Sequence, residues 1–389
     1  MPLLADRNQC TGCGACASSC THKCICMEPD EYGFVYPAIN ETNCVQCGLC
    51  EQRCPVVKKQ SPDAISSIPK AYAAYSKEES LRKESSSGAV FSEMAQYILD
   101  RGGAVFGAAY DEQYKVHHVC AVSKEELAGL RGAKYAQSDL GEVFVDVRSR
   151  LNRHQLVLFS GTPCQVAGLN SFLHKEYENL FCIDFVCHGV PSPMAWTAYV
   201  EYRAKKDNHG ELPRSINLRS KETGWSRYRY SNVFEYENGK RSVCSSSDSL
   251  FMKLFVGDYI CRPSCENCPF KGYSRISNLT LGDFWGIWDI KPEMDDNGGT
   301  SLILCQSDHG AKLLEDIADK LVMKQVTLEE ASRQNSSMLT ASPANPRRKE
   351  ALDMIRAGNI AACESWFRQP KKTMTQKLRH LVGSLLRKN

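Results

Sequence analysis

The apolar and polar positions along the chain fall into three stretches with different patterns. The first, residues 1–62, is short and rich in cysteine, has a strand-like run at 33–37, and is followed by a Pro-punctuated linker within 55–69. From residue 70 to 345, strand-like and helix-like apolar runs alternate, which predicts a mixed α/β domain. Within it, 212–244 reads as strand-rich, 249–259 as an apolar helix and 301–305 as a strand. Helical patterns then run to the end, and 346–389 reads as a helical, basic tail.

Composition excludes several broad classes of protein. The 389 residues are 42% hydrophobic and 24% charged, which is ordinary globular usage and argues against wholesale disorder. The chain has no apolar run long enough for a membrane helix and no secretory h-region at its start, so we expect a cytoplasmic protein. A net charge of +3 gives no broad basic surface for nucleic acid.

Cysteine departs from this ordinary composition. Of 20 cysteines, 10 lie between Cys10 and Cys54. Without a secretory signal a disulfide scaffold is not expected, so metal binding is the leading interpretation. The cluster contains the spacing C-x2-C-x2-C-x3-C twice, and the second run is followed by Pro55. The two runs are Cys10, Cys13, Cys16, Cys20 and Cys44, Cys47, Cys50, Cys54.

This repeated spacing is typical of two-cluster ferredoxins, in which the fourth cysteine of each run binds the other cluster. One 4Fe-4S cluster is expected on Cys10, Cys13, Cys16 and Cys54, and the other on Cys44, Cys47, Cys50 and Cys20. Glycines inside the runs, at Gly12, Gly14 and Gly48, suit tight turns around the sulfurs. Structural zinc is the alternative, although two identical four-Cys runs fit its paired knuckles poorly. Thr21 stands where Pro is usual, and Cys24 and Cys26 are expected to be small apolar residues, with a substitute-ligand role left open.

Further motifs, in this order, resemble the beta subunits of coenzyme F(420) hydrogenases and dehydrogenases. They are a Ser86-Ser87-Gly88 run before a helix, RGAKYAQSDL, FSGTPCQVAGL, DFVCHGVPS, CRPSCENCPFK and LTLGDFWG. The resemblance spans residues 70–303, and the ferredoxin segment in front makes the chain look like a bacterial or archaeal fusion of the two parts. It implies an FAD-binding iron-sulfur domain that passes electrons between clusters and a flavin, and in some members on to the deazaflavin coenzyme.

By the same resemblance, several short segments would hold the flavin. Lys134 would place a cation near the flavin and stabilise its reduced anion. The helix starts at 161–163 and 86–88 also offer free backbone N–H groups to an anion. The alternative interpretation of these helix starts is simple capping, and the alternative for the KYAQS segment is a non-specific surface loop. The implied flavin residues are Ser86, Ser87, Gly88, Lys134, Tyr135, Gln137, Ser138, Gly161, Thr162, Pro163, Cys164, His188 and Gly189.

A second group of cysteines predicts a third cluster. Cys261, Cys265 and Cys268 have the spacing C-x3-C-x2-C and supply three ligands, with Cys187 favoured over Cys164 as the fourth. Cys164 stands at a predicted helix start, where we expect its thiol pKa to be lowered. Zinc held by the three cysteines and the neighbouring histidine, His188, is the alternative.

The end of the chain has an amphipathic pattern. Its basic side chains would lie opposite one apolar helical face and could contact an acidic membrane or a partner, with docking on the protein itself as the alternative. The apolar face comprises Met374, Leu378, Leu381, Val382, Leu385 and Leu386.

These expectations combine into an α+β chain of three parts. They are a two-cluster 4Fe-4S ferredoxin domain at 1–62, a mixed α/β FAD and iron-sulfur domain at 70–345, and the tail at 346–389. The predicted function is an iron-sulfur flavoprotein oxidoreductase that moves electrons between the clusters and FAD, and on to a redox partner protein or small-molecule acceptor. An electron-transfer adapter without its own substrate, or a zinc-stabilised interaction protein, are the alternatives. No G-x-G-x-x-G fingerprint follows a strand, so the motifs do not name a nicotinamide acceptor.

Overall fold

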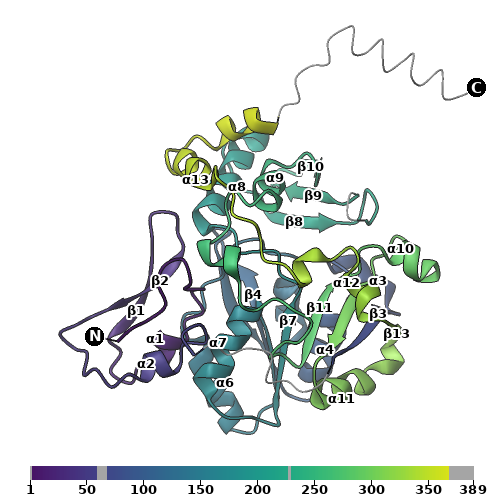
Figure 1. Ribbon diagram of the computed structural model, residues 1–389. Helices are drawn as coiled ribbons and strands as arrows, with labels where there is room; N and C mark the ends of the chain where they lie inside the picture. The colour runs from purple at the N-terminus through teal and green to yellow at the C-terminus, as the bar shows by residue number, and fades with distance from the viewer. Residues whose placement is uncertain (1, 59–67, 227–228, 368–389) are drawn as a thin grey trace, which may run out of the picture.

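The computed structural model describes residues 2–58, 68–226 and 229–367, and its N-terminal lobe lies to one side of the molecule (Figure 1). The lobe consists of a hairpin, β1 (Ile25–Pro29) and β2 (Val35–Ile39), and two short helices, α1 (Ala15–Ser19) and α2 (Leu49–Gln52). Each cysteine run enters one of the helices through a glycine, Gly14 or Gly48, with a φ of 72°. Only glycine adopts this left-handed conformation without cost, so the two runs fold alike for the same local reason.

The rest of the chain is built on one eight-stranded mixed sheet, which confirms the predicted mixed α/β class. Its central strands are parallel: β4 (Ala104–Tyr110), β6 (Val157–Ser160), β7 (Leu180–Phe185) and β11 (Leu279–Asp283). The antiparallel strand β5 (Val116–Ala121) forms one edge. The other side is completed by the antiparallel strands β12 (Ser301–Cys305), β3 (Lys70–Ser76) and β13 (Leu321–Val326).

Strand β13 differs from the prediction, which had mostly helical patterns after residue 305. Its sequence LVMKQV is too short for a helical period to be recognised, and it pairs with β3 over its whole length. Tertiary pairing at the sheet edge therefore decides its conformation.

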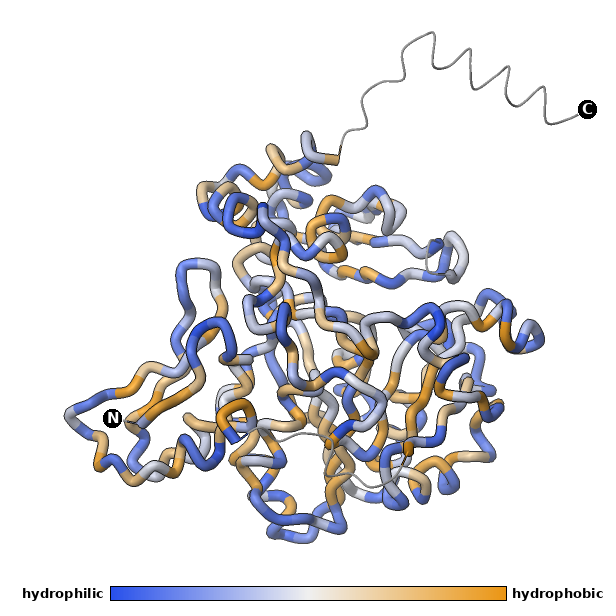
Figure 2. Tube along the Cα trace, in the orientation of Figure 1, coloured by the Kyte–Doolittle hydropathy of each residue, from blue (hydrophilic) through white to orange (hydrophobic). Residues whose placement is uncertain are grey.

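Helices cover both faces of the large sheet, and the apolar positions concentrate on its strands (Figures 1 and 2). One face carries α4 (Val90–Leu99), α5 (Lys124–Leu130) and α11 (Asp308–Asp316), whose Met94, Leu127 and Leu313 are fully buried. The other face carries α6 (Val143–Asn152) and α7 (Pro163–Leu173). Cys13 and Ala15 of the N-terminal lobe join that second core, so the lobe packs directly on α7.

A smaller layer stands above the large sheet in Figure 1. It contains the antiparallel sheet β8 (Ser215–Ser220), β9 (Ser231–Glu235) and β10 (Arg241–Ser245), with helices α8 (Pro193–Asn208) and α9 (Leu250–Val256). Both the strand-rich stretch and the apolar helix expected from the sequence are present here. Helix α13 (Arg348–Arg356) and the 3-10 helix η6 (Ile360–Phe367) pack on α8. The remaining short elements are α3 (Glu79–Glu84), η2 (Pro263–Asn267), α10 (Ile287–Ile290), η3 (Pro292–Met294), η4 (Ala318–Lys320), α12 (Leu328–Ser332) and η5 (Ser336–Met338).

Two predicted segments lie outside the described residues: most of the linker, at 59–67, and the amphipathic face of the tail, at 368–389. Among the helices that the structure does describe, none combines the length and apolarity that a bilayer crossing requires.

Candidate functional site

The two ferredoxin-type cysteine runs lie close together, with the last cysteine of each run beside the other run. Burial raises the pKa of the Cys16 thiol to about 12, with further contributions from the nearby Cys10 and Cys54. Cys54 also acts on the thiols of Cys10 and Cys13, so the last cysteine of the second run lies beside the first three of the first run. We call Cys10, Cys13, Cys16 and Cys54 site I, and Cys20, Cys44, Cys47 and Cys50 site II.

The two sites differ in exposure. Cys13 of site I is buried against the larger domain and Cys16 is buried within the lobe, whereas Cys47 of site II is exposed. Cys24 is buried with its Sγ 3.3 Å from the Sγ of Cys20, and Cys26 is exposed. Site II is therefore the part of the lobe that an external molecule can approach.

A third group of cysteines surrounds a small cavity below the end of β7. Cys164 lies in the first turn of α7, Cys187 follows β7, and Cys265 and Cys268 come from η2 and its C-terminal end. The Val190 N–H donates to the Cys265 Sγ over 3.3 Å, the kind of contact that tunes a metal-bound sulfur. We call Cys164, Cys187, Cys265 and Cys268 site III.

The lining of this cavity fits a negatively charged group. Arg262, Lys271 and Arg275 line it, and no aspartate or glutamate does. The Nε and Nη1 atoms of Arg275 and the Oγ1 of Thr11 are buried without a hydrogen-bond partner among the described residues. Buried cations need a compensating negative charge, which four thiolates on a metal centre would supply.

Cys261, expected to bind the third cluster, does not line this cavity. It is buried, and its Sγ donates to the Phe255 carbonyl over 3.8 Å. It also faces His188 and Asp258, whose Nε2 and Oδ1 atoms are 2.9 Å apart. Its thiol nevertheless lies near Cys265 and Cys187, so Cys261 stays a predicted ligand beside the cavity.

The expected low pKa of Cys164 is wrong. Burial raises the pKa of its thiol to about 11, and the neighbouring Cys268 adds to the rise. The hydroxyl of Thr162, 3.1 Å from the sulfur, acts in the opposite direction but is outweighed. Desolvation therefore dominates over the helix start.

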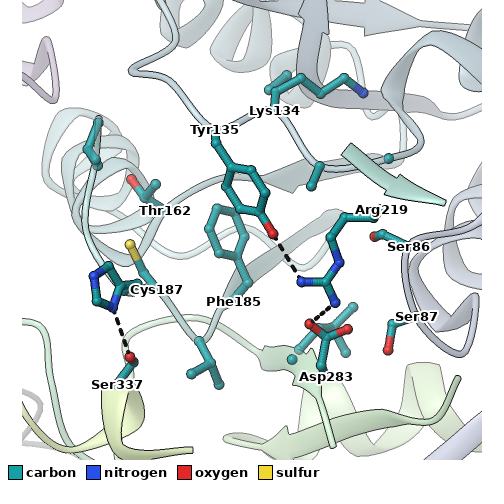
Figure 3. A pocket seen from close by; sticks show the side chains of 18 of the residues that line it. Ser86, Ser87, Lys134, Tyr135, Thr162, Phe185, Cys187, Arg219, Asp283 and Ser337 are labelled. Carbon is teal, nitrogen blue, oxygen red and sulfur yellow. Dashed lines mark hydrogen bonds and ion pairs between the residues drawn. The ribbon is translucent and has the colours of Figure 1, made fainter. Parts of the chain in front are cut away.

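A large cavity of about 830 Å³ lies at the carboxyl ends of β6, β7 and β11, and Arg219 of β8 in the small sheet also lines it (Figure 3). Its volume is within the roughly 300–1,000 Å³ of typical ligand sites. Every predicted flavin residue lines it except Gly88 and Pro163. Gly88 instead packs between β3 and β12, where a Cβ would lie 2.5 Å from the Ala74 carbonyl.

The turn between β6 and α7 presents a helix start to this cavity. Thr162 caps the helix, with its hydroxyl accepting from the Gln165 N–H while the Gln165 side chain accepts from the Thr162 N–H over 3.0 Å. Pro163 occupies the first helical position, where its missing N–H costs nothing. The helix capping that was the alternative to anion binding is thus present, and the same turn also faces the cavity.

Two side chains of the 134–138 loop, Lys134 and Gln137, point in different directions. Lys134 donates to the Gly129 and Arg131 carbonyls, and burial lowers its pKa to about 7. Gln137 instead turns toward the N-terminal lobe, where its side chain donates to the Thr11 carbonyl over 3.4 Å.

Arg219 is a cavity residue that sequence reasoning missed. It is buried, its Nη2 lies 2.6 Å from the Asp283 Oδ2, and its Nη1 donates to the Tyr135 hydroxyl over 3.1 Å (Figure 3). Its guanidinium stacks over the rings of Trp225 and Tyr230 at 4.5 and 4.3 Å. These partners come from three separate segments, so no local motif indicates the cluster.

His118 is a second residue without a sequence signal. Burial lowers its pKa to about 4, so it is neutral at pH 7. Its ring nitrogens contact the Ser160 carbonyl at 3.0 Å and the Ser138 hydroxyl at 2.9 Å, and Ser138 accepts from the Gln165 side chain at 2.8 Å. This chain of hydrogen bonds joins the 134–138 loop to the start of α7 and fixes the cavity wall.

Comparisons with known proteins match both parts of the chain. Residues 71–144 and 154–331 match the N-terminal and C-terminal parts of the family of coenzyme F(420) hydrogenase/dehydrogenase beta subunits. Residues 9–57 match the 4Fe-4S dicluster domain.

Two curated relatives align over part of their length. The chain is 23% identical over 207 residues to an F(420)H(2) dehydrogenase subunit of Methanosarcina mazei, covering 49% of this chain and 58% of the relative. It is 26% identical over 206 residues to the uncharacterized protein MJ1349 of Methanocaldococcus jannaschii, covering 45% of this chain and 56% of the relative. The aligned segment thus spans less than two thirds of either relative.

One solved structure has a similar chain. It is the xenon-derivatized F(420)-reducing nickel-iron hydrogenase complex from Methanosarcina barkeri. The match covers 76% of this chain and 90% of that chain, with 14% identity and a TM-score of 0.45.

Proposed function

Because the chain belongs to the family of coenzyme F(420) hydrogenase and dehydrogenase beta subunits, we propose that it is an iron-sulfur flavoprotein oxidoreductase. In this proposal sites I, II and III hold 4Fe-4S clusters and the large cavity holds FAD. Electrons pass one at a time through the cysteine sites and are paired on the flavin for a two-electron acceptor or donor. The deazaflavin named for the curated relative is one such molecule.

The observation that carries the proposal is the continuity of the sites. Gly168 of α7 packs on Cys13 of site I, and Cys164 of site III lies one helical turn earlier. Cys164 and Cys187 line both the small cavity and the large one, so site III shares a wall with the flavin cavity. Cys47 of site II is exposed, which makes this site the entry point for a redox partner protein.

The large cavity has the properties that a flavin requires. Its cations, including Lys134 and Arg219, favour phosphates and a reduced, anionic ring, while the start of α7 offers backbone N–H groups. Phe185, 40% exposed, presents an apolar ring to the cavity close to Cys187 (Figure 3). FAD, when bound, supplies the conversion between one-electron and two-electron chemistry, and the protein contributes position, charge and exclusion of water.

Cofactor content tests the proposal. Protein purified anaerobically is expected to carry about twelve irons, matching acid-labile sulfide, and one FAD per chain, because each 4Fe-4S site holds four irons. Metal analysis, sulfide assay and release of flavin measure this. About eight irons with zinc and no flavin would contradict it.

Turnover separates an enzyme from an adapter. If the protein has its own substrate, then with dithionite it reduces a soluble two-electron acceptor without any second protein. A requirement for a second protein would favour an electron-transfer adapter that delivers electrons through site II. The full-length chain with its iron-sulfur clusters and FAD is used both with and without the second protein.

Flavin binding is expected to weaken as pH rises above about 7. Burial lowers the pKa of Lys134 to about 7, so below that pH its ammonium attracts an anionic ligand and above it the free protein carries a neutral amine. The affinity for FAD should fall by up to about tenfold per pH unit above 7. Fluorescence titration of the flavin between pH 6 and 8.5 measures this. Lys134→Met should bind more weakly and lose this pH dependence, whereas Lys124→Met, at the exposed Asp100 pair, should behave as wild type.

A further inference from the structure

Arg262 is a fully buried cation that connects the two domains. It is 1% exposed and caps η2, the element that carries Cys265 of site III. Its guanidinium reaches into the N-terminal lobe, where Nε donates to the Cys10 carbonyl over 2.8 Å and Nη2 to the Val35 carbonyl over 2.9 Å. Arg262 therefore touches site I through its side chain and lines the cavity of site III.

No carboxylate in the described part of the chain forms an ion pair with Arg262. Its remaining hydrogen bond, from Nη1, goes to the neutral Gln137 Oε1 over 2.8 Å. By contrast, the buried Arg203 and Arg219 each lie beside an aspartate. A buried cation with only neutral partners is costly, so negative charge must come from another group nearby.

The cysteines of both sites lie within reach of this charge. The guanidinium is hydrogen-bonded to the backbone of Cys10 in site I. The same side chain lines the small cavity beside Cys164 and Cys265 of site III. One guanidinium thus lies next to the ligands of two separate sites.

The guanidinium of Arg262 lies close to the site I loop and is held in a fixed position. A Cβ on Gly12, which has a φ of 69°, would lie 2.9 Å from the Arg262 Nη1, so the glycine lets the site I loop approach the guanidinium. The guanidinium is also stacked 4.2 Å from the centre of the Tyr36 ring. The charge is therefore held at one place between the sites and needs no rearrangement when an electron moves.

We propose that Arg262 is a positioning residue for electron transfer whose fixed positive charge stabilises the reduced states of the centres at both site I and site III. The inference rests on the proposed function. In each transfer one electron leaves the reduced centre on one side and reaches the oxidised centre on the other. No bond is made or broken and the guanidinium keeps its proton. By favouring reduction on both sides, Arg262 raises the two potentials together.

Redox titration of the loaded, full-length protein, followed by low-temperature EPR, tests the inference. Arg262→Gln removes the charge, and we expect the one-electron reduction of both centres to become at least about tenfold less favourable, a shift of about 59 mV to more negative potential. Gln137→Glu keeps Arg262 but places a carboxylate at its Nη1, and should shift both potentials in the same direction. Arg262→Lys, which keeps the charge, should stay close to wild type. Arg203→Gln, which removes a buried arginine that lines neither cavity, should leave both potentials unchanged.

Iron and flavin content is measured first on every variant. It distinguishes a failure of the proposed function from a failure of the role proposed for Arg262. Wild-type protein without iron at site III or without flavin would refute the proposed function, whatever Arg262 does. Fully loaded Arg262→Gln and Gln137→Glu proteins with wild-type potentials would overturn the role of Arg262. Equal shifts in Arg262→Lys and Arg262→Gln would overturn it too, because they would show that the shape of the side chain matters and not its charge. If Arg262→Gln fails to load iron, Gln137→Glu and Arg262→Lys decide by the same criteria.

Discussion

Replacing Cys164 with alanine is expected to remove about four irons per chain, whereas replacing Cys261 with alanine should remove none. Cys164 lines the small cavity together with Cys187, Cys265 and Cys268, and Cys261 does not. A 4Fe-4S centre needs four ligands, and alanine at Cys164 leaves three. The loss should be seen in iron and sulfide content and in a smaller visible absorbance, with the irons of sites I and II retained.

The two variants control for each other, because both remove a buried thiol from the same neighbourhood. Cys182→Ala, a buried thiol on β7 that lines neither cavity, adds a control for general loss of packing. If Cys261→Ala loses the four irons and Cys164→Ala keeps them, the ligand set is Cys261, Cys265 and Cys268 with Cys187. In that case the small cavity is not the position of the third cluster.

The sequence predicted the parts of this protein that depend on local spacing. The two cysteine runs and the glycines within them are periodic, and a left-handed turn before each short helix follows directly from that spacing. The strand, Gly-Thr-Pro turn and helix at 157–173 were equally legible, because capping residues and Pro at the first helical position mark a helix start. Strand β13 was missed because its conformation is decided by pairing with β3.

The lining of the large cavity was predicted where its residues are neighbours in the sequence and missed where folding joins distant segments. Arg219 meets Tyr135 and Asp283 from separate elements, and none of the three has a spacing that indicates the others. The direction of the pKa shift of the Cys164 thiol could not be predicted from the sequence either. It depends on burial, which capping motifs do not indicate.

Enlarging Gly168 is expected to slow electron passage from the N-terminal lobe to the flavin. A Cβ at Gly168 would lie 2.9 Å from the Cβ and 3.1 Å from the Sγ of Cys13, so a leucine must push the site I loop off α7. Overpacking of this kind costs about 1–3 kcal/mol and is relieved by moving the lobe, because the lobe packs on α7. The path from Cys13 to Cys164, now one helical turn along α7, would lengthen, and electron transfer weakens steeply with distance.

Stopped-flow mixing with a one-electron reductant, with visible absorbance followed for clusters and flavin separately, measures this effect. In Gly168→Leu the lobe clusters should still be reduced at the wild-type rate while the flavin lags, with iron and flavin content unchanged. Gly168→Ala should give an intermediate lag, since it adds the first atom of the clash. Gly129→Leu, on the exposed side of α5 where a Cβ has no neighbour within 4 Å, provides the matched control and should show no lag. Wild-type flavin kinetics in fully loaded Gly168→Leu would mean that electrons do not pass along α7, and the order of sites proposed for the chain would have to be abandoned.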